Sequence, residues 1–199
     1  MGLGQAYPAS LSIQHLCCMR SGRLVLDNIN LSLTGGQMAW VKGPNGCGKS
    51  TLLRCISGLI PAFDGEITYH GIISLHDGNA ALDEELSVEN ALKFWANLDD
   101  IAADKLAQSA EIFGLGHIMD IPVHMLSTGQ RQRAALTRTI CGNADIWLLD
   151  EPYNGLDQHN VAMLNHAIKI HLDNGGMVII TSHNDIIIEN ITPIILDLS

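Results

Sequence analysis

The chain has 199 residues, a length that favours a single domain with a sizeable buried core. Its 11 Lys and Arg residues against 21 Asp and Glu residues give a net charge of −10, which argues against a general affinity for nucleic acid or anionic lipid. No apolar run approaches the roughly 18 residues that span a bilayer, and the first residues lack the pattern of an export signal. The five cysteines and nine histidines show no metal-ligand spacing, so we expect a reduced compartment and no zinc site.

Taken in chain order, short apolar strands alternate with helical patterns, which predicts an α/β protein. The first expected strands are Leu11–Ile13, Leu24–Leu33, Met38–Gly43 and, after a turn at Pro61–Gly65, Glu66–His70. Residues 86–119 carry apolar residues at three- and four-residue spacing, which is typical of helices. The nearly continuous apolar runs "DIWLLDEP" and "GGMVIITSH" predict central strands of a parallel sheet that is covered on both faces.

The segment "GPNGCGKST" satisfies the pattern G-x-x-x-x-G-K-S/T and lies between a predicted strand and a predicted helix. Glycines let successive backbone N–H groups surround a phosphate, while Lys49 would reach the terminal phosphates and the Ser50 hydroxyl would bind Mg²⁺. The expected cofactors are therefore ATP and Mg²⁺. The predicted nucleotide-binding residues are Gly43, Pro44, Asn45, Gly46, Cys47, Gly48, Lys49, Ser50 and Thr51.

About a hundred residues later, "IWLLDEP" places two carboxylates at the carboxyl end of a predicted central strand. In an open α/β sheet, ligands bind at that edge. Asp150 is expected to order the Mg²⁺ shell, and Glu151 to polarise the attacking water as general base. "MVIITSH" supplies another strand that ends at the same edge, with His183 at its tip as a candidate catalytic residue beside Glu151.

The stretch "LSTGQRQRAALTRTI" reads as a helix start that concentrates arginines in an acidic chain. Ser127 is a plausible N-cap, and Gly129 would let a ligand approach the backbone. Free N–H groups at a helix start attract anions, which suggests a second anion site besides the phosphate-binding loop.

These motifs, followed by "GLD" at Gly155–Asp157, stand in the order and at the spacing of the nucleotide-binding domain of ABC ATPases, which essentially the whole chain resembles. The resemblance implies an α/β P-loop NTPase with a RecA-like core, an N-terminal antiparallel β part and a small helical subdomain. It implies one domain over residues 1–199, with the helical subdomain inserted at about residues 86–140.

The same resemblance assigns roles to the remaining motifs. The signature residues are Leu126, Ser127, Thr128, Gly129 and Gln130, with Thr128 departing from the usual LSGGQ. Two copies would pack head to tail as a homodimer, so that Ser127 and Gly129 of one contact the γ-phosphate held by Lys49 of the other. Gly155, Leu156 and Asp157 would form the D-loop that joins the two sites, and His183 would sense the γ-phosphate.

Within the ABC ATPases, several segments are most similar to the ATP-binding subunits of the haem exporter of cytochrome c maturation, the CcmA family. They include "CCMRSGRLVLDNINLSL", "TLLRCISGLIPAFDGEI" and "SVENALKFWANL". The resemblance implies ATP hydrolysis that drives CcmB- or CcmC-like integral-membrane subunits from the cytoplasmic face of the inner membrane, with no nucleic-acid partner. Whether the cargo is haem or a haem-loaded chaperone stays open.

Two departures from the ABC pattern leave residues to be assigned. No aromatic residue precedes the second strand to stack on adenine, so either Arg20 stacks on the base as a planar cation or the base is held loosely. The usual glutamine of the Q-loop is missing from "SLHDGNAALDEEL"; His76, Asp77 and Asn79 are candidates, and Asn79 keeps the amide chemistry.

Three other functions are less consistent with the sequence. The chain could serve another small ABC transporter. A soluble ABC ATPase that acts on DNA or ribosomes usually carries long insertions or basic surface, and neither is present. A small-molecule kinase would share the phosphate-binding loop but would have no role for LSTGQ or GLD.

Overall fold

The computed structural model describes residues 9–78, 81–183 and 185–199. The strands are β1 (Ser10–Arg20), β2 (Arg23–Thr34), β3 (Met38–Lys42), β4 (Asp64–His70), β5 (Ile73–His76), β6 (Ile146–Asp150), β7 (Met177–Thr181) and β8 (Ile194–Asp197). The α-helices are α1 (Lys49–Ile56), α2 (Val88–Leu98), α3 (Ala103–Ile112), α4 (Thr128–Cys141) and α5 (Gln158–Asp173), with 3₁₀ turns at Gly116–Ile118 and Val123–Met125. The strands and helices confirm the α/β class expected from the sequence.

The N-terminal strands form an antiparallel sheet in the order β2-β1-β4. β1 continues well beyond the predicted Leu11–Ile13, because β2 and β4 pair with it on both sides and supply hydrogen-bond partners along its length. Ser21 and Gly22, with φ of 50° and 77°, make the two-residue turn between β1 and β2. Positive φ at both positions matches the right-handed twist of a hairpin.

The second sheet is parallel and has the order β5-β6-β7-β3-β8. β6 and β7, predicted from their apolar runs, are buried along their whole length, which confirms their central position. The edge strands β5 and β8 were not predicted, since each is four residues long and partly exposed.

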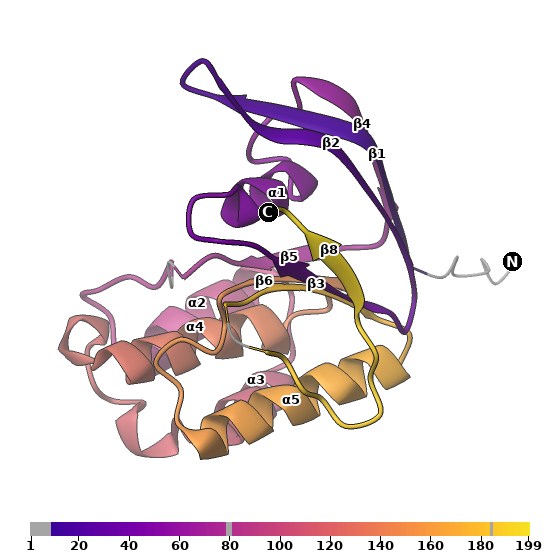
Figure 1. Cartoon of the computed structure of the whole chain (residues 1–199). Helices are drawn as coiled ribbons and strands as arrows, with labels where there is room; N and C mark the ends of the chain where they lie inside the picture. The colour runs from indigo at the N-terminus through magenta and orange to yellow at the C-terminus, as the bar shows by residue number, and fades with distance from the viewer. Residues whose placement is uncertain (1–8, 79–80, 184) are drawn as a thin grey trace, which may run out of the picture.

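The elements stack in four layers (Figure 1). α1 lies between the antiparallel sheet and the parallel sheet, and α2 to α5 cover the opposite face of the parallel sheet. Side chains of β6 alternate between the two resulting cores: Ile146 and Leu148 join the α1 side, whereas Trp147 and Leu149 join the side of the other helices.

The predicted helical stretch at residues 86–119 contains two helices, α2 and α3, in agreement with its helical spacing. α2 begins at an N-cap, Ser87, whose hydroxyl accepts the Asn90 N–H, and it ends before Asp100, which has a left-handed φ of 52°. α3 follows, and Phe113 and Leu115 just beyond it are fully buried against the helices. The break lets the chain fold back so that α2 and α3 both pack on α4.

Candidate active site

The phosphate-binding loop connects β3 to α1 and is covered by the antiparallel sheet. Gly48, the residue before α1, has a φ of 113°, and a Cβ there would lie 2.9 Å from Leu26 and 3.0 Å from Val25. Both the backbone angle and the space therefore require glycine. β2 thus packs against the loop, and the start of α1 lines a cavity in which free backbone N–H groups would suit a phosphate.

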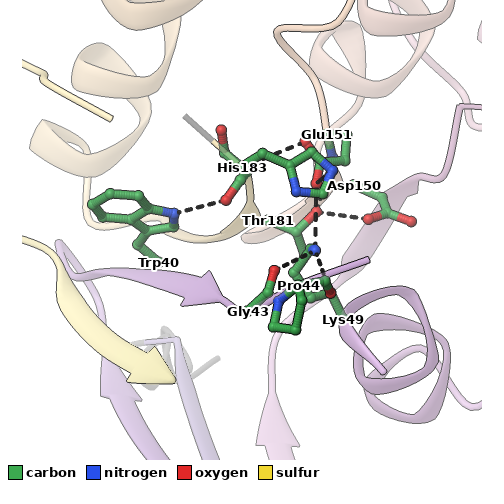
Figure 2. Close-up of polar contacts among 9 residues, drawn as sticks. Trp40, Gly43, Pro44, Lys49, Asp150, Glu151, Thr181 and His183 are labelled. Carbon is green, nitrogen blue, oxygen red and sulfur yellow. Dashed lines mark hydrogen bonds and ion pairs between the residues drawn. The ribbon is translucent and has the colours of Figure 1, made fainter. Parts of the chain in front are cut away.

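Lys49 is held at the centre of this loop. Its side chain is buried, and Nζ donates to the carbonyl oxygens of Gly43 at 2.8 Å and Pro44 at 3.2 Å. Nζ also lies 3.8 Å from Oε1 of Glu151, the residue directly after β6 (Figure 2). The ammonium is therefore positioned by the backbone where a phosphate would need a cation.

Asp150 and Glu151 lie at the carboxyl end of β6, as predicted. Asp150 is buried and follows the alternation of Ile146 and Leu148, so it faces α1. Glu151 leaves the strand with a left-handed φ of 47°, which is uncommon for a residue with a side chain. This turn directs Glu151 toward Lys49 and His183 instead of continuing the strand (Figure 2).

His183 follows β7 and faces Glu151. Its Nε2 lies 2.9 Å from Glu151 Oε1, and its backbone N–H donates to Oε2 at 3.4 Å. A side chain of β3 contacts the residue before His183. The Trp40 indole donates a hydrogen bond to the Ser182 carbonyl at 3.4 Å (Figure 2).

Lys42, the last residue of β3, contacts both Trp40 and a residue that follows His183. Its ammonium lies 3.5 Å above the Trp40 ring and 3.8 Å from the Asp185 carboxylate. A cation over an indole face is favourable, so Lys42 links Trp40 to the residues that follow His183.

A cavity of about 190 Å³ joins these groups. Its lining comprises Asn45, Gly46, Gly48, Lys49, Ser50, Thr51, Asp150, Glu151 and His183. Phosphate donors, a cation, two carboxylates and a histidine thus share one space, which suits the binding of a nucleoside triphosphate and the activation of water beside it.

The signature segment lies away from this cavity. Ser127 caps α4 by accepting the Gln130 N–H, while the Gln130 side chain accepts the Ser127 N–H, which confirms the predicted N-cap as a capping box. A Cβ on Gly129 would lie 2.8 Å from the Gly155 carbonyl oxygen, so the predicted signature turn and the predicted D-loop pack backbone to backbone. Among the described residues that line the cavity, none comes from either segment.

The comparisons with known proteins agree with this geometry. The sequence profile of the ABC transporter family matches residues 26–154. The chain belongs to this family. A cytochrome c biogenesis ATP-binding export protein CcmA of Sphingopyxis alaskensis is 45% identical over 87% of this chain and 89% of its own length. The CcmA protein of Novosphingobium aromaticivorans is 40% identical over 88% and 90% of the two chains. Both relatives place the chain among the CcmA proteins of the ABC family.

Solved structures support the same fold. An ABC transporter ATP-binding protein of Pyrococcus furiosus superimposes with a TM-score of 0.81, is 27% identical, and covers 95% of this chain and 97% of its own. The predicted ABC-type P-loop fold, with an antiparallel β part and a parallel core sheet, is therefore confirmed. The protein is an ABC ATPase.

His76 connects three elements of the ABC domain. It ends β5, is 2% exposed, and its Nε2 lies 3.0 Å from the Gln132 side-chain nitrogen of the signature helix. The Gln132 side-chain nitrogen also donates to the carbonyl of Pro152, the residue directly after Glu151. Burial lowers the pKa of His76 to about 4, so the ring is neutral near pH 7 and accepts from the amide.

The structure places the other predicted residues as follows. Asp157 accepts the Asn160 N–H as N-cap of α5, so one of its carboxylate oxygens is already used within the chain. Arg20 is exposed at the end of β1 beside the hairpin turn, and its stacking on adenine stays a prediction. Asn79, the predicted Q-loop residue, lies outside the described residues.

Sequence reasoning missed two residues that contact the site. The sequence predicts only that Trp40 belongs to the strand Met38–Gly43, although its indole reaches the backbone next to His183. Thr181 was read as the end of an aliphatic strand, yet its hydroxyl contacts both Asp150 and Glu151. The one available signal was a hydroxyl side chain at the end of the run "MVIIT".

Proposed function

We propose that the chain is a single ABC ATPase domain over residues 1–199 that hydrolyses ATP to drive haem export or delivery for c-type cytochrome biogenesis. The observation that carries the proposal is the cavity where Lys49, Asp150, Glu151 and His183 meet. The names of the CcmA relatives support the export role in cytochrome c biogenesis. Residues 86–140 then form the helical subdomain that carries the signature.

The donor set fits Mg²⁺. Ser50 and Asp150 bring a hydroxyl and a carboxylate to the same cavity, and Mg²⁺ prefers a few such oxygen ligands together with water and phosphate oxygens. In the part of the chain that the structure describes, no three His, Cys, Asp or Glu side chains form a metal cage, as a softer ion would need. When bound, Mg²⁺ neutralises charge on the β- and γ-phosphates.

In the proposed reaction Lys49 binds the terminal phosphates, and Glu151 accepts the proton of the attacking water. His183, 2.9 Å from Glu151, keeps that carboxylate directed at the γ-phosphate and senses its presence. Lys49 and His183 thus approach the same carboxylate oxygen, Oε1. The chain supplies positioning and charge stabilisation, which is most of what phosphoryl transfer requires of a protein.

The position of the signature supports a head-to-tail homodimer. Ser127 and Gly129 form a helix start that attracts anions, but among the described residues they do not line the cavity of their own chain. We therefore assign them to the ATP of a second copy, with Gly155 to Asp157 at the junction between the two sites.

Complementation between two broken subunits tests the dimer. Lys49→Ala disables the phosphate-binding loop, whereas Ser127→Asp keeps a good helix cap and places a negative charge where a phosphate must approach. Both are made on a Glu151→Gln background, and dimers are measured by size-exclusion chromatography with ATP. Each variant alone should stay monomeric, and the mixture should regain dimers because one site combines two intact halves.

Ser127→Asn is the matched control for the dimer experiment, since it caps the helix equally well without the charge and its amide can still donate to a phosphate. It should dimerise with ATP by itself. Absence of any gain on mixing Lys49→Ala with Ser127→Asp would show that signature and loop serve the same ATP within one chain.

Integral-membrane subunits of the CcmB or CcmC type are the proposed partners, with this chain bound to the cytoplasmic face of the inner membrane. None of the helices in the described residues combines the length and apolarity needed to cross a bilayer. A groove of about 360 Å³ is the candidate docking surface for a cytoplasmic segment of those subunits. It is lined by Ala81, Leu82, Asp83, Leu86, Ala91, Phe94 and Trp95.

The groove suits this role because its first lining residue, Ala81, follows β5 closely in the sequence. β5 ends at His76, which pairs with Leu149, the residue before Asp150. Phe94 is 58% exposed there and packs edge-on against Trp95, an apolar surface that a partner would cover.

Deletion of the gene tests the biological role. Covalent haem attachment to c-type cytochromes, detected by haem staining of denaturing gels, should be lost while b-type cytochromes persist. The wild-type gene should restore the stain and Glu151→Gln should not. Normal c-type cytochromes in the deletion strain would assign the chain to another ABC transporter.

A further inference from the structure

Thr181, the last residue of β7, contacts both carboxylate residues of the active site without lining its cavity. Its hydroxyl donates to Asp150 Oδ1 at 2.6 Å and accepts the Glu151 N–H at 2.9 Å (Figure 2). We propose that Thr181 is a positioning residue for ATP hydrolysis, whose hydroxyl fixes the Asp150 carboxylate and the Glu151 backbone for metal binding and water activation. This inference rests on the proposed ATPase function.

Strand register brings the hydroxyl to this place. β6 and β7 are parallel neighbours in which Asp150 pairs with Thr181. Both residues continue the alternation of side chains that faces α1 and the phosphate-binding loop. The Thr181 side chain is fully buried, so water does not compete for either of its bonds.

The two bonds form a chain with one possible direction. Because the Glu151 N–H can only donate, the threonine oxygen accepts from it, and its own proton is left for the Asp150 carboxylate. Such serial bonds polarise and strengthen one another in a buried environment. A bond of 2.6 Å to Oδ1 restrains the rotation of the Asp150 carboxylate, and Oδ2 is then the oxygen that would serve as a ligand for a metal ion.

The Glu151 bond acts on backbone conformation. Glu151 has a φ of 47°, a conformation that L-residues adopt at an energetic cost and keep where surrounding contacts enforce it. With Thr181 as its acceptor, the Glu151 amide is satisfied although it has left the strand ladder. That conformation carries the side chain toward Lys49 and His183, so the threonine hydroxyl supports the general base as well as the metal ligand.

The test removes the hydroxyl and preserves the volume. Thr181→Val is isosteric, Thr181→Ser keeps the hydroxyl, and Thr137→Val is the matched control. Thr137 is also fully buried, and its hydroxyl donates to the Arg133 carbonyl within α4. For each variant we measure Mn²⁺ binding by electron paramagnetic resonance with a non-hydrolysable ATP analogue, analogue binding in EDTA, and ATP turnover against Mg²⁺ concentration.

For Thr181→Val we expect Mn²⁺ affinity and turnover to fall about 10- to 100-fold, the usual effect of losing a group that orients a metal ligand. Analogue binding in EDTA should stay within about threefold, because Lys49 and the loop are untouched. Thr181→Ser and Thr137→Val should resemble the wild type. A purely structural role for Thr181 would instead lower metal-free nucleotide binding and thermal stability together.

Two results would overturn the inference. One is wild-type Mn²⁺ affinity in Thr181→Val; the other is an equal loss in Thr181→Ser, which would implicate the methyl group. If Thr181→Val fails to fold, Thr181→Ala replaces it, and the same difference from Thr181→Ser is required. A wild-type protein without Mg²⁺-dependent ATP hydrolysis would refute the proposed function instead, and the Mn²⁺ measurement would still decide the role of Thr181.

Discussion

The buried His76 should make the protein lose stability in mild acid. Burial is the largest cause of its lowered pKa, about 4; the charge of Arg138 lowers it further, whereas those of Asp77 and Asp150 raise it. In the unfolded chain a histidine titrates near pH 6.5. Protonation in the folded state would also convert His76 Nε2 from an acceptor into a donor. Nε2 would then face the Gln132 amide nitrogen, which is itself a donor.

The sign and the size of the effect follow from these two pKa values. Between about pH 4 and 6.5 the unfolded chain binds a proton that folded His76 does not, so stability falls as pH decreases through this range. The full difference of about 2.5 pKa units corresponds to roughly 3 kcal/mol, of which roughly 2 kcal/mol is already lost at pH 5.

Urea denaturation at pH 7.5 and pH 5, followed by tryptophan fluorescence, measures this loss. His76→Gln cannot titrate, so its free energy of unfolding should change less between the two pH values than that of the wild type, by roughly 2 kcal/mol. His117→Gln, an exposed histidine in a 3₁₀ turn, is the control and should keep the wild-type pH dependence. Equal pH dependence in His76→Gln and wild type would refute the reasoning.

Two further predictions concern the active site. Glu151→Gln should keep ATP binding but lower turnover about 10²- to 10⁴-fold, the usual contribution of a general base, and turnover at the normal rate would remove Glu151 from that role. Trp40→Phe deletes the indole donor to the Ser182 carbonyl and should lower turnover several-fold with nucleotide binding unchanged. Trp147→Phe is its control, because the buried indole N–H of Trp147 has no hydrogen-bond partner among the described residues; equal effects would argue against positioning by Trp40.

Local sequence alone determined the phosphate-binding loop and the two central strands. The loop is short, and its glycines, lysine and serine make the motif recognisable from local sequence, although β2 also packs against Gly48 in the folded chain. β6 and β7 are recognisable because a strand buried on both faces must be apolar at almost every position. The N-cap of α4 was predictable because it is also local. Ser127 and Gln130 form reciprocal hydrogen bonds within one turn of the helix.

Tertiary structure decided the edge strands and the positioning contacts. β5 has four residues and becomes a strand because Ile73 to His76 find hydrogen-bond partners on β6, and β8 does so through β3. Periodicity cannot identify such short segments, whose conformation depends on a neighbour far away in sequence. The same holds for Thr181, which reaches Asp150 across 31 residues because the register of two strands sets them side by side.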